Sequence, residues 1–455
     1  MMIHLPKRQL TLLGGDAILI MASLYIAPFV RFGIFPDASF IFTLTCVVAI
    51  LAYLLIFYIL DFYNLDEPLN MISAMRFAAA LIIANFIIAA ILYLMRVPLY
   101  SGTVFIFNSI LILYFCLTWR VVFNRFLKHK RRPFRVVVIG SGRAGRALGK
   151  VLSGNRDYEI AGFMDDDSKK WGMKIGANSV IGGTEILPSF LVEKKIEKII
   201  VAITHSIRPE LYARLVEAKM RGIVVYDMPS FYEKMLGKIP VNHVSDLWFV
   251  YTPISGVKRT IFNYKVKRIC DLCLSLVGLL LTMPIIALVA LAIKLDSPGP
   301  LFYIQRRIGW NERVFDLVKF RSMKDGTDVE RDFAGQRCDP RITRVGRVVR
   351  LFRLDEIPQL WNVLKGDMSF IGPRALMVEE VHAFTSRIPY FSLRHCIRPG
   401  ITGWAQINYP HGATENDALE KLQYDLFYIK NLSPLLDLHI FLRTFYIVLF
   451  GKGAR

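Results

Sequence analysis

The sequence predicts a membrane protein with three parts: a bundle of four N-terminal transmembrane helices, an α/β middle domain and a mostly α-helical C-terminal domain. Composition is the first observation, because 54% of the 455 residues are hydrophobic and the mean hydropathy is +0.40. The second is a glycine-rich turn that follows an apolar strand pattern near residue 140. The third is a net charge of +20 gathered beside apolar segments, which predicts membrane lipid and phosphate-bearing ligands as partners, and no nucleic acid.

The first part, residues 1–125, contains the predicted transmembrane helices. Each of four apolar stretches has about the 20 residues that a spanning helix needs. They are Leu10–Val30, Phe40–Leu60, Phe77–Met95 and Val104–Val122. Lys7 and Arg8 precede the first stretch and a basic run that begins at Arg125 follows the fourth, so both ends are predicted on the cytoplasmic face. We therefore expect a multi-pass protein.

The second part, residues 134–245, has the pattern of a Rossmann-like cytoplasmic domain. A buried strand at Arg135–Ile139 leads into a glycine turn and a helix, and a second strand, Tyr158–Met164, ends at an acidic residue about 20 positions beyond the glycines. The candidate nucleotide-binding residues are Gly140, Gly142, Gly145 and Asp165. The same glycines also permit a tight turn and close helix packing without a ligand, so a domain with and a domain without bound nucleotide are both open.

A fifth apolar segment, Ile269–Ile293, lies within a stretch at about 265–294 that begins and ends with basic residues. Pro284 sits in its middle, where it removes a helix hydrogen bond and bends the axis. A straight crossing would carry residues 294–455 to the far side of the membrane, away from the middle domain. We therefore expect a re-entrant helix that enters and leaves on the cytoplasmic face, with an ordinary kinked span as the alternative.

The carboxylate pair Asp355-Glu356 is the candidate for catalysis, because basic residues surround it. Arg374 follows the pair. Five arginines precede it: Arg341, Arg344, Arg347, Arg350 and Arg353. A carboxylate attacks phosphorus only when the phosphoryl oxygens are neutralised, and guanidinium groups with a divalent cation supply that neutralisation. A second pair, Asp66-Glu67, lacks such a cluster. The pattern predicts phosphoryl transfer through an aspartyl intermediate.

Four motifs follow one another in the last part of the chain, residues 258–455. They are Asp296–Gly309, Phe315–Met323, Arg341–Leu376 and Ile397–Asn408. With these motifs the region closely resembles the bacterial polyprenyl-phosphate sugar-1-phosphate transferases, which are monotopic phosphoglycosyl transferases. The whole layout resembles the large members that initiate exopolysaccharide or O-antigen synthesis. The resemblance implies transfer of a sugar 1-phosphate from a UDP-sugar to undecaprenyl phosphate, with Mg²⁺ and release of UMP, on the cytoplasmic face of the bacterial inner membrane.

The resemblance also implies roles for individual residues. Asp355 corresponds to the nucleophile and metal contact, with Glu356 beside it. The residues implied to bind phosphate are Lys319, Arg321, Arg350 and Arg374. Those implied to support the site are Asp425 and Arg398. The chain departs from the family pattern at Ala375, where a second proline is common, and at Phe352-Arg353, where a small hydroxyl residue is more usual; neither departure touches the nucleophile.

Two other functions stay as alternatives. A membrane-anchored nucleotide-sugar dehydratase or epimerase would use residues 134–245, but the Tyr-x-x-x-Lys pair that such chemistry usually needs occurs nowhere in the chain. A non-enzymatic, nucleotide-sensing scaffold would not need Asp355. The motifs do not specify the sugar, and the large middle domain makes a homodimer plausible. We therefore expect a transferase whose middle domain serves regulation or assembly.

Overall fold

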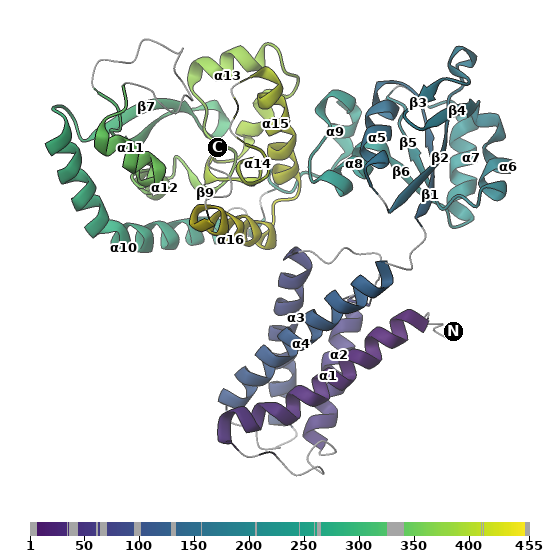
Figure 1. Ribbon diagram of the computed structural model, residues 1–455, viewed down its shortest axis with the longest axis horizontal. Coiled ribbons are helices and arrows are strands. Elements are labelled where there is room, and N and C mark those ends of the chain that lie inside the picture. The colour runs from purple at the N-terminus through teal and green to yellow at the C-terminus, as the bar shows by residue number, and fades with distance from the viewer. Residues whose placement is uncertain are drawn as a thin grey trace. The chain divides into compact units, whose positions relative to one another are not determined.

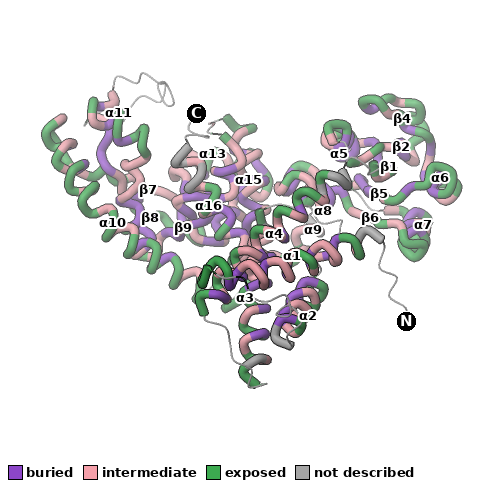
Figure 2. Tube along the Cα trace, turned by 60° about the horizontal axis from the view of Figure 1, so that its bottom comes forward, coloured by how far each residue is buried: buried purple, intermediate pink, exposed green. Residues whose placement is uncertain are grey.

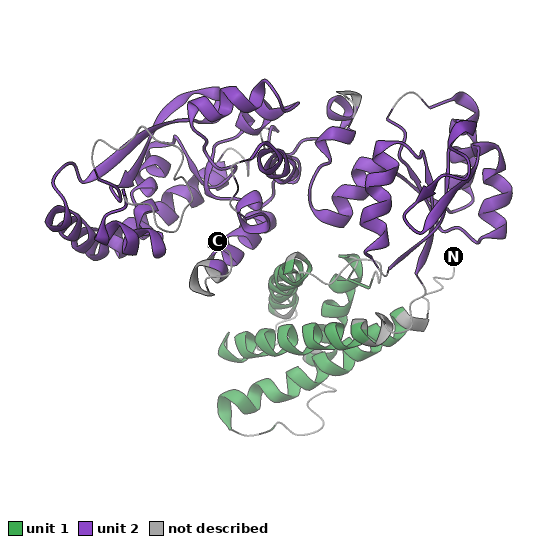
Figure 3. Ribbon diagram, turned by 45° about the horizontal axis from the view of Figure 1, so that its top comes forward, with its two compact units in different colours: residues 1–132 green, residues 133–455 purple. Residues whose placement is uncertain are grey.

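The computed structural model describes most of the chain. The described residues are 7–33, 35, 44–60, 62–63, 71–94, 102–128, 133–155, 157–204, 207–244, 246–258, 260–261, 265–324, 341–410, 412 and 414–450. Two compact units are present, residues 1–132 and 133–455 (Figure 3). The second unit contains the sheet of the α/β domain and the elements of the C-terminal domain.

Unit 1 consists of apolar helices, and the prediction of four near the N-terminus is confirmed. They are α1 (Lys7–Phe32), α2 (Leu44–Ile59), α3 (Met71–Leu94) and α4 (Gly102–Lys128). By length and composition α1, α3 and α4 could each span a membrane, whereas α2 is a shorter apolar helix over the residues that are described. Residues 40–43 of the predicted second stretch, and the Asp66-Glu67 pair, lie outside the described residues.

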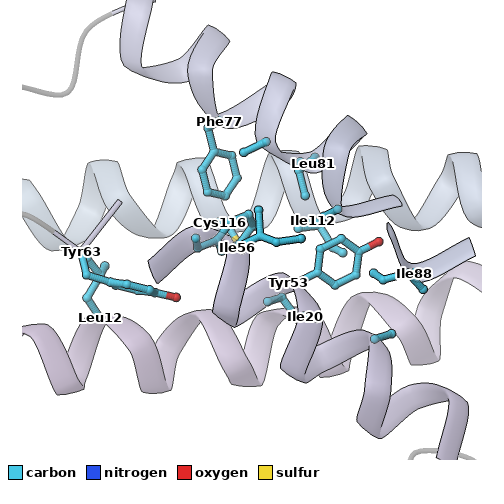
Figure 4. Close-up of a cluster of buried hydrophobic side chains, with 14 residues drawn as sticks. Leu12, Ile20, Tyr53, Ile56, Tyr63, Phe77, Leu81, Ile88, Ile112 and Cys116 are labelled. Carbon is cyan, nitrogen blue, oxygen red and sulfur yellow. The ribbon is translucent and has the colours of Figure 1, made fainter. Parts of the chain in front are cut away.

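The helices of unit 1 pack around a core of aromatic and aliphatic side chains (Figure 4). Tyr53 on α2, Phe77 on α3 and Ile112 on α4 are almost completely buried in it. An ion pair is buried as well, with an Arg120 guanidinium nitrogen 2.7 Å from Asp16 Oδ1. Either charge alone would be costly in an apolar bundle, so the pair ties α1 to α4.

Unit 2 begins with a six-stranded sheet and its covering helices. The elements are β1 (Phe134–Ile139), α5 (Arg143–Ser153), β2 (Tyr158–Met164), β3 (Lys174–Ile175), β4 (Asn178–Gly182), α6 (Leu187–Glu193), β5 (Lys198–Val201), α7 (Pro209–Met220), β6 (Val224–Asp227), α8 (Met228–Leu236) and α9 (Asp246–Tyr251). The strand order is β3-β4-β2-β1-β5-β6; within this sheet the described β3–β4 pair is antiparallel and the other described pairs are parallel. This order, which runs outward from β1 in both directions, is that of Rossmann-like folds.

Helices cover both faces of this sheet (Figure 1). Val138 belongs to the core under α5 and α8, whereas its neighbours Val137 and Ile139 belong to the core under α6 and α7. All three side chains are fully buried. A central parallel strand covered on both faces is apolar at successive positions, which is why β1 was recognisable as an unbroken apolar run.

The C-terminal domain of unit 2 is mostly helical. Its elements are α10 (Lys267–Asp296), β7 (Phe302–Ile308), β8 (Val314–Phe320), α11 (Arg344–Leu351), η8 (Leu354–Glu356), α12 (Gln359–Lys365), β9 (Ser369–Ile371), α13 (Val378–Thr385), η9 (Phe391–Cys396), β10 (Gly400–Thr402), α14 (Trp404–Asn408), α15 (Glu415–Lys430) and α16 (Pro434–Phe450). β7 pairs antiparallel with β8, and β9 pairs parallel with β10. Of the predicted site residues, Lys319 lies on β8 and Arg374 follows β9.

Helix α10 is a continuous helix of 30 residues with Pro284 inside it. Its axis turns along its length (Figure 1), and much of its surface is exposed (Figure 2). The Thr282 hydroxyl donates to the Gly278 carbonyl at 2.7 Å, a type of bond that often bends helices. Pro284 and this bond are two local causes for curvature of the helix.

Both ends of α10 are held by the C-terminal domain. Near its start, Asp271 Oδ1 accepts from the backbone N–H of Phe370 on β9 at 2.9 Å. At its end, Asp296 Oδ2 accepts from the backbone N–H of Val345 on α11 at 2.9 Å. The two ends of this apolar helix therefore contact one and the same domain.

Candidate active site

The Asp355-Glu356 pair lies in a single turn of 3₁₀ helix, η8, between α11 and α12. The residue before that turn, Arg353, has a left-handed backbone with φ of 53°. This conformation is strained for a residue other than glycine, and such strain is concentrated at functional sites. Arg353 lies between the end of α11 and the start of η8. The two carboxylates therefore lie at the junction of α11 and α12.

Two cations hold Glu356. Its Oε1 atom lies 3.3 Å from an Arg374 guanidinium nitrogen and 3.8 Å from Lys319 Nζ. Burial by itself would raise the Glu356 pKa, but the charges of Arg374 and Lys319 outweigh that effect and hold the pKa below its ordinary value. Glu356 therefore stays ionised and fixes the positions of both cations.

Asp355 is in the opposite electrostatic situation. Burial, and then the negative charge of Glu356, raise the pKa of Asp355, while Lys319 and Arg350 oppose the rise. Among the described residues, the ion pairs at this turn go to Glu356. The two neighbouring carboxylates thus differ in kind: Glu356 is committed to holding cations, whereas the charge of Asp355 is left for a ligand to stabilise.

The β7–β8 hairpin brings Lys319 to the site, and with it an arginine that the sequence analysis did not select. Tyr303 lies opposite Lys319, and Arg307 lies opposite Phe315. Because alternate residues of a strand share a face, Arg307 stands on the same face as Lys319. Arg307 NH1 donates to the Ala375 carbonyl at 3.0 Å, next to Arg374. Arg307 lies in the motif Asp296–Gly309 and Lys319 in the motif Phe315–Met323. The alternation of side chains between the two faces of paired strands could have identified Arg307 from the sequence.

Two glycine turns that lie against each other place Arg374. The Gly372 N–H donates to the Thr402 carbonyl at 2.9 Å, and the Gly400 N–H donates to the Pro373 carbonyl at 2.8 Å. A Cβ atom at Gly400 would overlap the backbone of Gly372. Glycine is therefore needed for this close approach. The motif that contains Gly400 acts on the site by fixing the backbone that carries Arg374.

A buried ion pair supports the same backbone. An Arg394 guanidinium nitrogen lies 2.8 Å from Asp425 Oδ2 and donates to the Arg374 carbonyl at 3.1 Å. Both side chains of the pair are at least 96% buried. Burial raises the pKa of Asp425 to about 6, although Arg394 opposes the rise. Asp425 was predicted to support the site. It contacts Arg394, and through Arg394 it helps to position the backbone of Arg374.

The other two predicted arginines make contacts within the scaffold. Arg321 is buried and donates to the carbonyls of Ser297 and Pro298, each at 2.7 Å, which fastens the end of α10. Arg398 donates to the Gly366 carbonyl at 3.0 Å, and its guanidinium lies 4.8 Å from the centre of a tryptophan ring. The predicted residues that the structure gathers around one point are Asp355, Glu356, Lys319, Arg350 and Arg374.

The glycine turn of the α/β domain has structural duties of its own. Gly140 has φ of 101°, and a Cβ atom at Gly145 would overlap the Gly140 carbonyl, whereas Gly142 faces open space. Asp165 accepts from the backbone N–H and the hydroxyl of Ser141, at 2.9 and 2.7 Å, and also pairs with a lysine. The carboxylate expected to bind ribose is thus used to hold the turn.

A cavity of about 290 Å³ opens beside Glu356. Parts of its wall belong to η8, α12, β9, β10, α14 and α16. Among the lining side chains are Phe352, Leu360, Phe370, Ile401 and Ile407. The cavity therefore joins an apolar wall to the charged group of the candidate site.

Comparison with known proteins shows the family of the chain. Residues 262–451 match the model of the bacterial sugar transferase family. The chain is 40% identical over 190 residues to exopolysaccharide production protein PSS of Rhizobium leguminosarum bv. phaseoli, covering 39% of this chain and 92% of the relative. The chain belongs to the bacterial sugar transferase family.

Two longer relatives carry more specific names. The chain is 36% identical over 241 residues to UDP-N-acetylgalactosamine-undecaprenyl-phosphate N-acetylgalactosaminephosphotransferase of Aeromonas hydrophila, covering 53% of this chain and 56% of the relative. It is 33% identical over 341 residues to undecaprenyl-phosphate glucose phosphotransferase of Komagataeibacter xylinus, covering 71% of this chain and 61% of the relative. The chain thus spans somewhat more than half of these two relatives. The names do not favour a dehydratase or epimerase.

Replacing Lys319 with glutamine should shift the acid limb of the pH profile of sugar transfer to higher pH. A nucleophilic Asp355 would have to be ionised. Its charge is lost as the pH falls through its pKa, and removing a nearby cation raises that pKa further. At neutral pH the rate should fall by about 10²–10³-fold, the usual loss for one such donor. Lys365→Gln, at an exposed lysine of α12, is the matched control. An acid limb that stays in place would contradict the assignment.

Proposed function

We propose that the protein transfers a sugar 1-phosphate from a UDP-sugar to undecaprenyl phosphate and releases UMP, through a covalent intermediate on Asp355. The proposal rests on the difference between the two carboxylates of η8. Glu356 is ion-paired to Lys319 and Arg374, while the neighbouring Asp355 has a raised pKa. A nucleophilic carboxylate beside immobilised phosphate-binding cations is what phosphoryl transfer through an aspartyl intermediate requires.

The proposed reaction has two displacements at one phosphorus atom. In the first, an Asp355 carboxylate oxygen attacks the phosphorus that bears the sugar; the P–O bond to the uridylyl phosphate breaks, and UMP leaves with the bond electrons. In the second, a phosphate oxygen of the lipid attacks the same phosphorus, and the acyl–phosphate bond to Asp355 breaks. Lys319 and Arg374 neutralise the phosphoryl oxygens in both steps.

The carboxylate pair also fits a magnesium ion. Among the described residues, no group of three or more His, Cys, Asp or Glu side chains is placed to hold a metal. Mg²⁺ is commonly bound by one or two carboxylates together with substrate phosphates, and Asp355 has a carboxylate that is not consumed by an ion pair in this part of the chain. Asp355 is therefore the proposed protein ligand, and the ion would supply further neutralisation of phosphate charge.

The apolar cavity beside Glu356 is the proposed place for the isoprenoid end of the lipid. Its aliphatic and aromatic walls suit a hydrocarbon chain. Arg353 and Glu356 line the same cavity, so a lipid held there would have its phosphate near the charged residues. Phe352, at which the chain departs from the family pattern, lines it as well and thereby adds apolar surface.

We further propose that α10 is re-entrant and that the catalytic domain lies on the cytoplasmic face of the inner membrane. The helix is about 45 Å long at 1.5 Å per residue, which would suffice to cross a bilayer. Its two ends are nevertheless bonded to one domain, through Asp271 and Asp296. A bent helix with exposed apolar side chains and both ends on one domain fits a segment that dips into one leaflet.

Asp355→Asn should abolish UMP release from a UDP-sugar in nanodiscs that contain Mg²⁺ and undecaprenyl phosphate, because the amide cannot attack phosphorus. The donor is identified by testing UDP-sugars one at a time, beginning with UDP-glucose and UDP-N-acetylgalactosamine. Intact mass measured without the lipid should show a sugar-phosphate adduct on the wild type only. Glu379→Gln, at an exposed glutamate of α13, is the control and should keep full activity. Normal release by Asp355→Asn would refute the mechanism.

Phe352→Ser should raise the KM for undecaprenyl phosphate about tenfold and leave formation of the intermediate unchanged. Burying a phenylalanine side chain is worth about 1.5–3 kcal/mol, and this ring is partly exposed without lipid. The adduct measured without lipid separates the two half-reactions. Leu351→Ser, at an exposed neighbour that is not among the lining residues, is the matched control. An equal KM for undecaprenyl phosphate in both variants would contradict binding of the lipid in this cavity.

Cysteine labelling should place both ends of α10 on the same side of the membrane. In a background without other cysteines, the exposed native Cys270 and, separately, Lys294→Cys are treated with a membrane-impermeant maleimide in sealed cells and in inverted vesicles. Ser153→Cys reports the side of the α/β domain. A re-entrant helix predicts one shared pattern for all three positions. Labelling of Cys270 and Lys294→Cys from opposite sides would establish an ordinary span.

A further inference from the structure

A cavity of about 350 Å³ lies in the α/β domain at the carboxyl ends of β5 and β6, beside the first turn of α5. In open parallel sheets, ligands bind outside the carboxyl ends of the strands, where the strand order reverses. In this sheet the order reverses at β1 and β5. Its described lining shares no residue with the cavity beside Glu356, so it is a separate site.

The walls of this cavity suit a planar ring attached to a sugar. The apolar and aromatic lining includes Ile203, Tyr212, Val216, Tyr226 and Trp248. At the end of β6, Asp227 Oδ2 accepts from the Ser230 N–H at 3.3 Å and from the Trp248 indole N–H at 3.2 Å. Within the described ranges both bonds go to Oδ2, which leaves Oδ1 for a ligand. In this class of fold the carboxylate that binds ribose hydroxyls ends the second strand. Asp227 offers the same chemical group at the end of β6.

Basic groups stand at the same cavity. Lys219 on α7 and His243 line it. Burial, and then the charge of Arg143, lower the pKa of His243, which places Arg143 at the start of α5 near that imidazole. Lys219 at the cavity wall and Arg143 near His243 suit an anionic ligand such as a phosphate.

We propose that this cavity binds a nucleoside 5′-phosphate, with the base between the apolar walls, the ribose diol on Asp227 and the phosphate toward Arg143 and Lys219. Asp227 thereby takes the role that the sequence suggested for Asp165, whose oxygens are occupied by the glycine turn.

The cavity wall also contacts the transferase part of unit 2. Lys430 Nζ, at the end of α15, lies 4.7 Å from the centre of the Trp248 ring and 2.5 Å from Glu233 Oε2 on α8. Asn431, which follows α15, donates to Glu233 Oε1 at 2.7 Å. Asp227 at the cavity is the N-cap of α8. Through Glu233, α8 is thus bonded to the end of α15.

The same α15 carries Asp425, whose partner Arg394 donates to the Arg374 carbonyl. A nucleotide that shifts Trp248 or α8 is therefore in a position to shift Arg374. On the basis of the proposed transferase function, occupancy of the cavity changes the rate of sugar-phosphate transfer. The direct contacts make Lys430 and Glu233 the connecting residues.

Calorimetry on the full chain in nanodiscs tests the binding half. UMP, AMP, GMP and CMP are titrated in turn, each beside its 2′-deoxy form, into the wild type and into Val216→Trp, which fills the cavity from α7. At least one ribonucleotide should bind, its 2′-deoxy form about tenfold more weakly because the diol to Asp227 is incomplete. Val216→Trp should lose that binding, and Glu217→Ala, an exposed neighbour paired with Arg221, should keep it.

The outcomes separate this site from the transfer site. A nucleotide whose binding persists unchanged in Val216→Trp is bound at another site, as UMP would be at the transfer site. The proposal is overturned if no nucleotide loses binding in Val216→Trp, or if none of the four binds at all. Asp227→Asn should weaken the ribonucleotide to the level of its 2′-deoxy form. All of these readouts stand even if Asp355→Asn proves fully active, because none of them measures transfer.

The rate of UMP release with and without the bound nucleotide tests the coupling half. In the wild type the rate should change at least threefold at saturation, and in Val216→Trp it should not change. When UMP is itself the ligand, a labelled UDP-sugar and the Val216→Trp comparison remove the effect of product inhibition. Binding without any change of rate would overturn the coupling to α15.

Discussion

The ion pairs of Glu356 with Arg374 and Lys319 are the interaction on which the candidate site depends. Two adjacent carboxylates repel each other and both resist ionisation in a partly buried site. Because Glu356 takes the two cations, it remains charged. Burial, and then the charge of Glu356, raise the pKa of Asp355. Glu356 thus holds Lys319 and Arg374 in place. Asp355 beside it is the proposed nucleophile, and a bound phosphate or cation would stabilise its charged form.

The rest of the C-terminal domain can be understood as the scaffold of those ion pairs. Lys319 needs the β7–β8 hairpin, and Arg374 needs the turns at Gly372 and Gly400, whose backbones approach too closely for any side chain. The buried pair of Arg394 with Asp425 then holds the Arg374 carbonyl. Buried ion pairs add little net stability but penalise any arrangement that leaves one partner alone, so this pair favours a single position of the turn.

The membrane imposes a second constraint beside the ion pairs of the site, and α10 is the element that must satisfy both. An apolar helix with little of its surface covered by protein needs lipid around it, whereas the proposed UDP-sugar donor is water-soluble. Bonds from Asp271 to β9 and from Asp296 to α11 attach the helix to the elements that carry the site. The chemistry is thereby kept close to the apolar surface where a lipid acceptor would be found.

The sequence by itself determined the four apolar helices, the parallel sheet and the Asp355-Glu356 pair within a basic region, because apolar runs, glycine turns and charge clusters are local properties. Only the tertiary structure decided which cations reach the carboxylates. Arg321 and Arg398 lie in the predicted motifs but bond to backbone carbonyls of the scaffold, while Arg307 joins the site through the pairing of two strands. Likewise Asp165 follows the expected spacing yet holds Ser141. A motif specifies which charges are present, but the direction and reach of each side chain depend on packing between segments far apart in the chain.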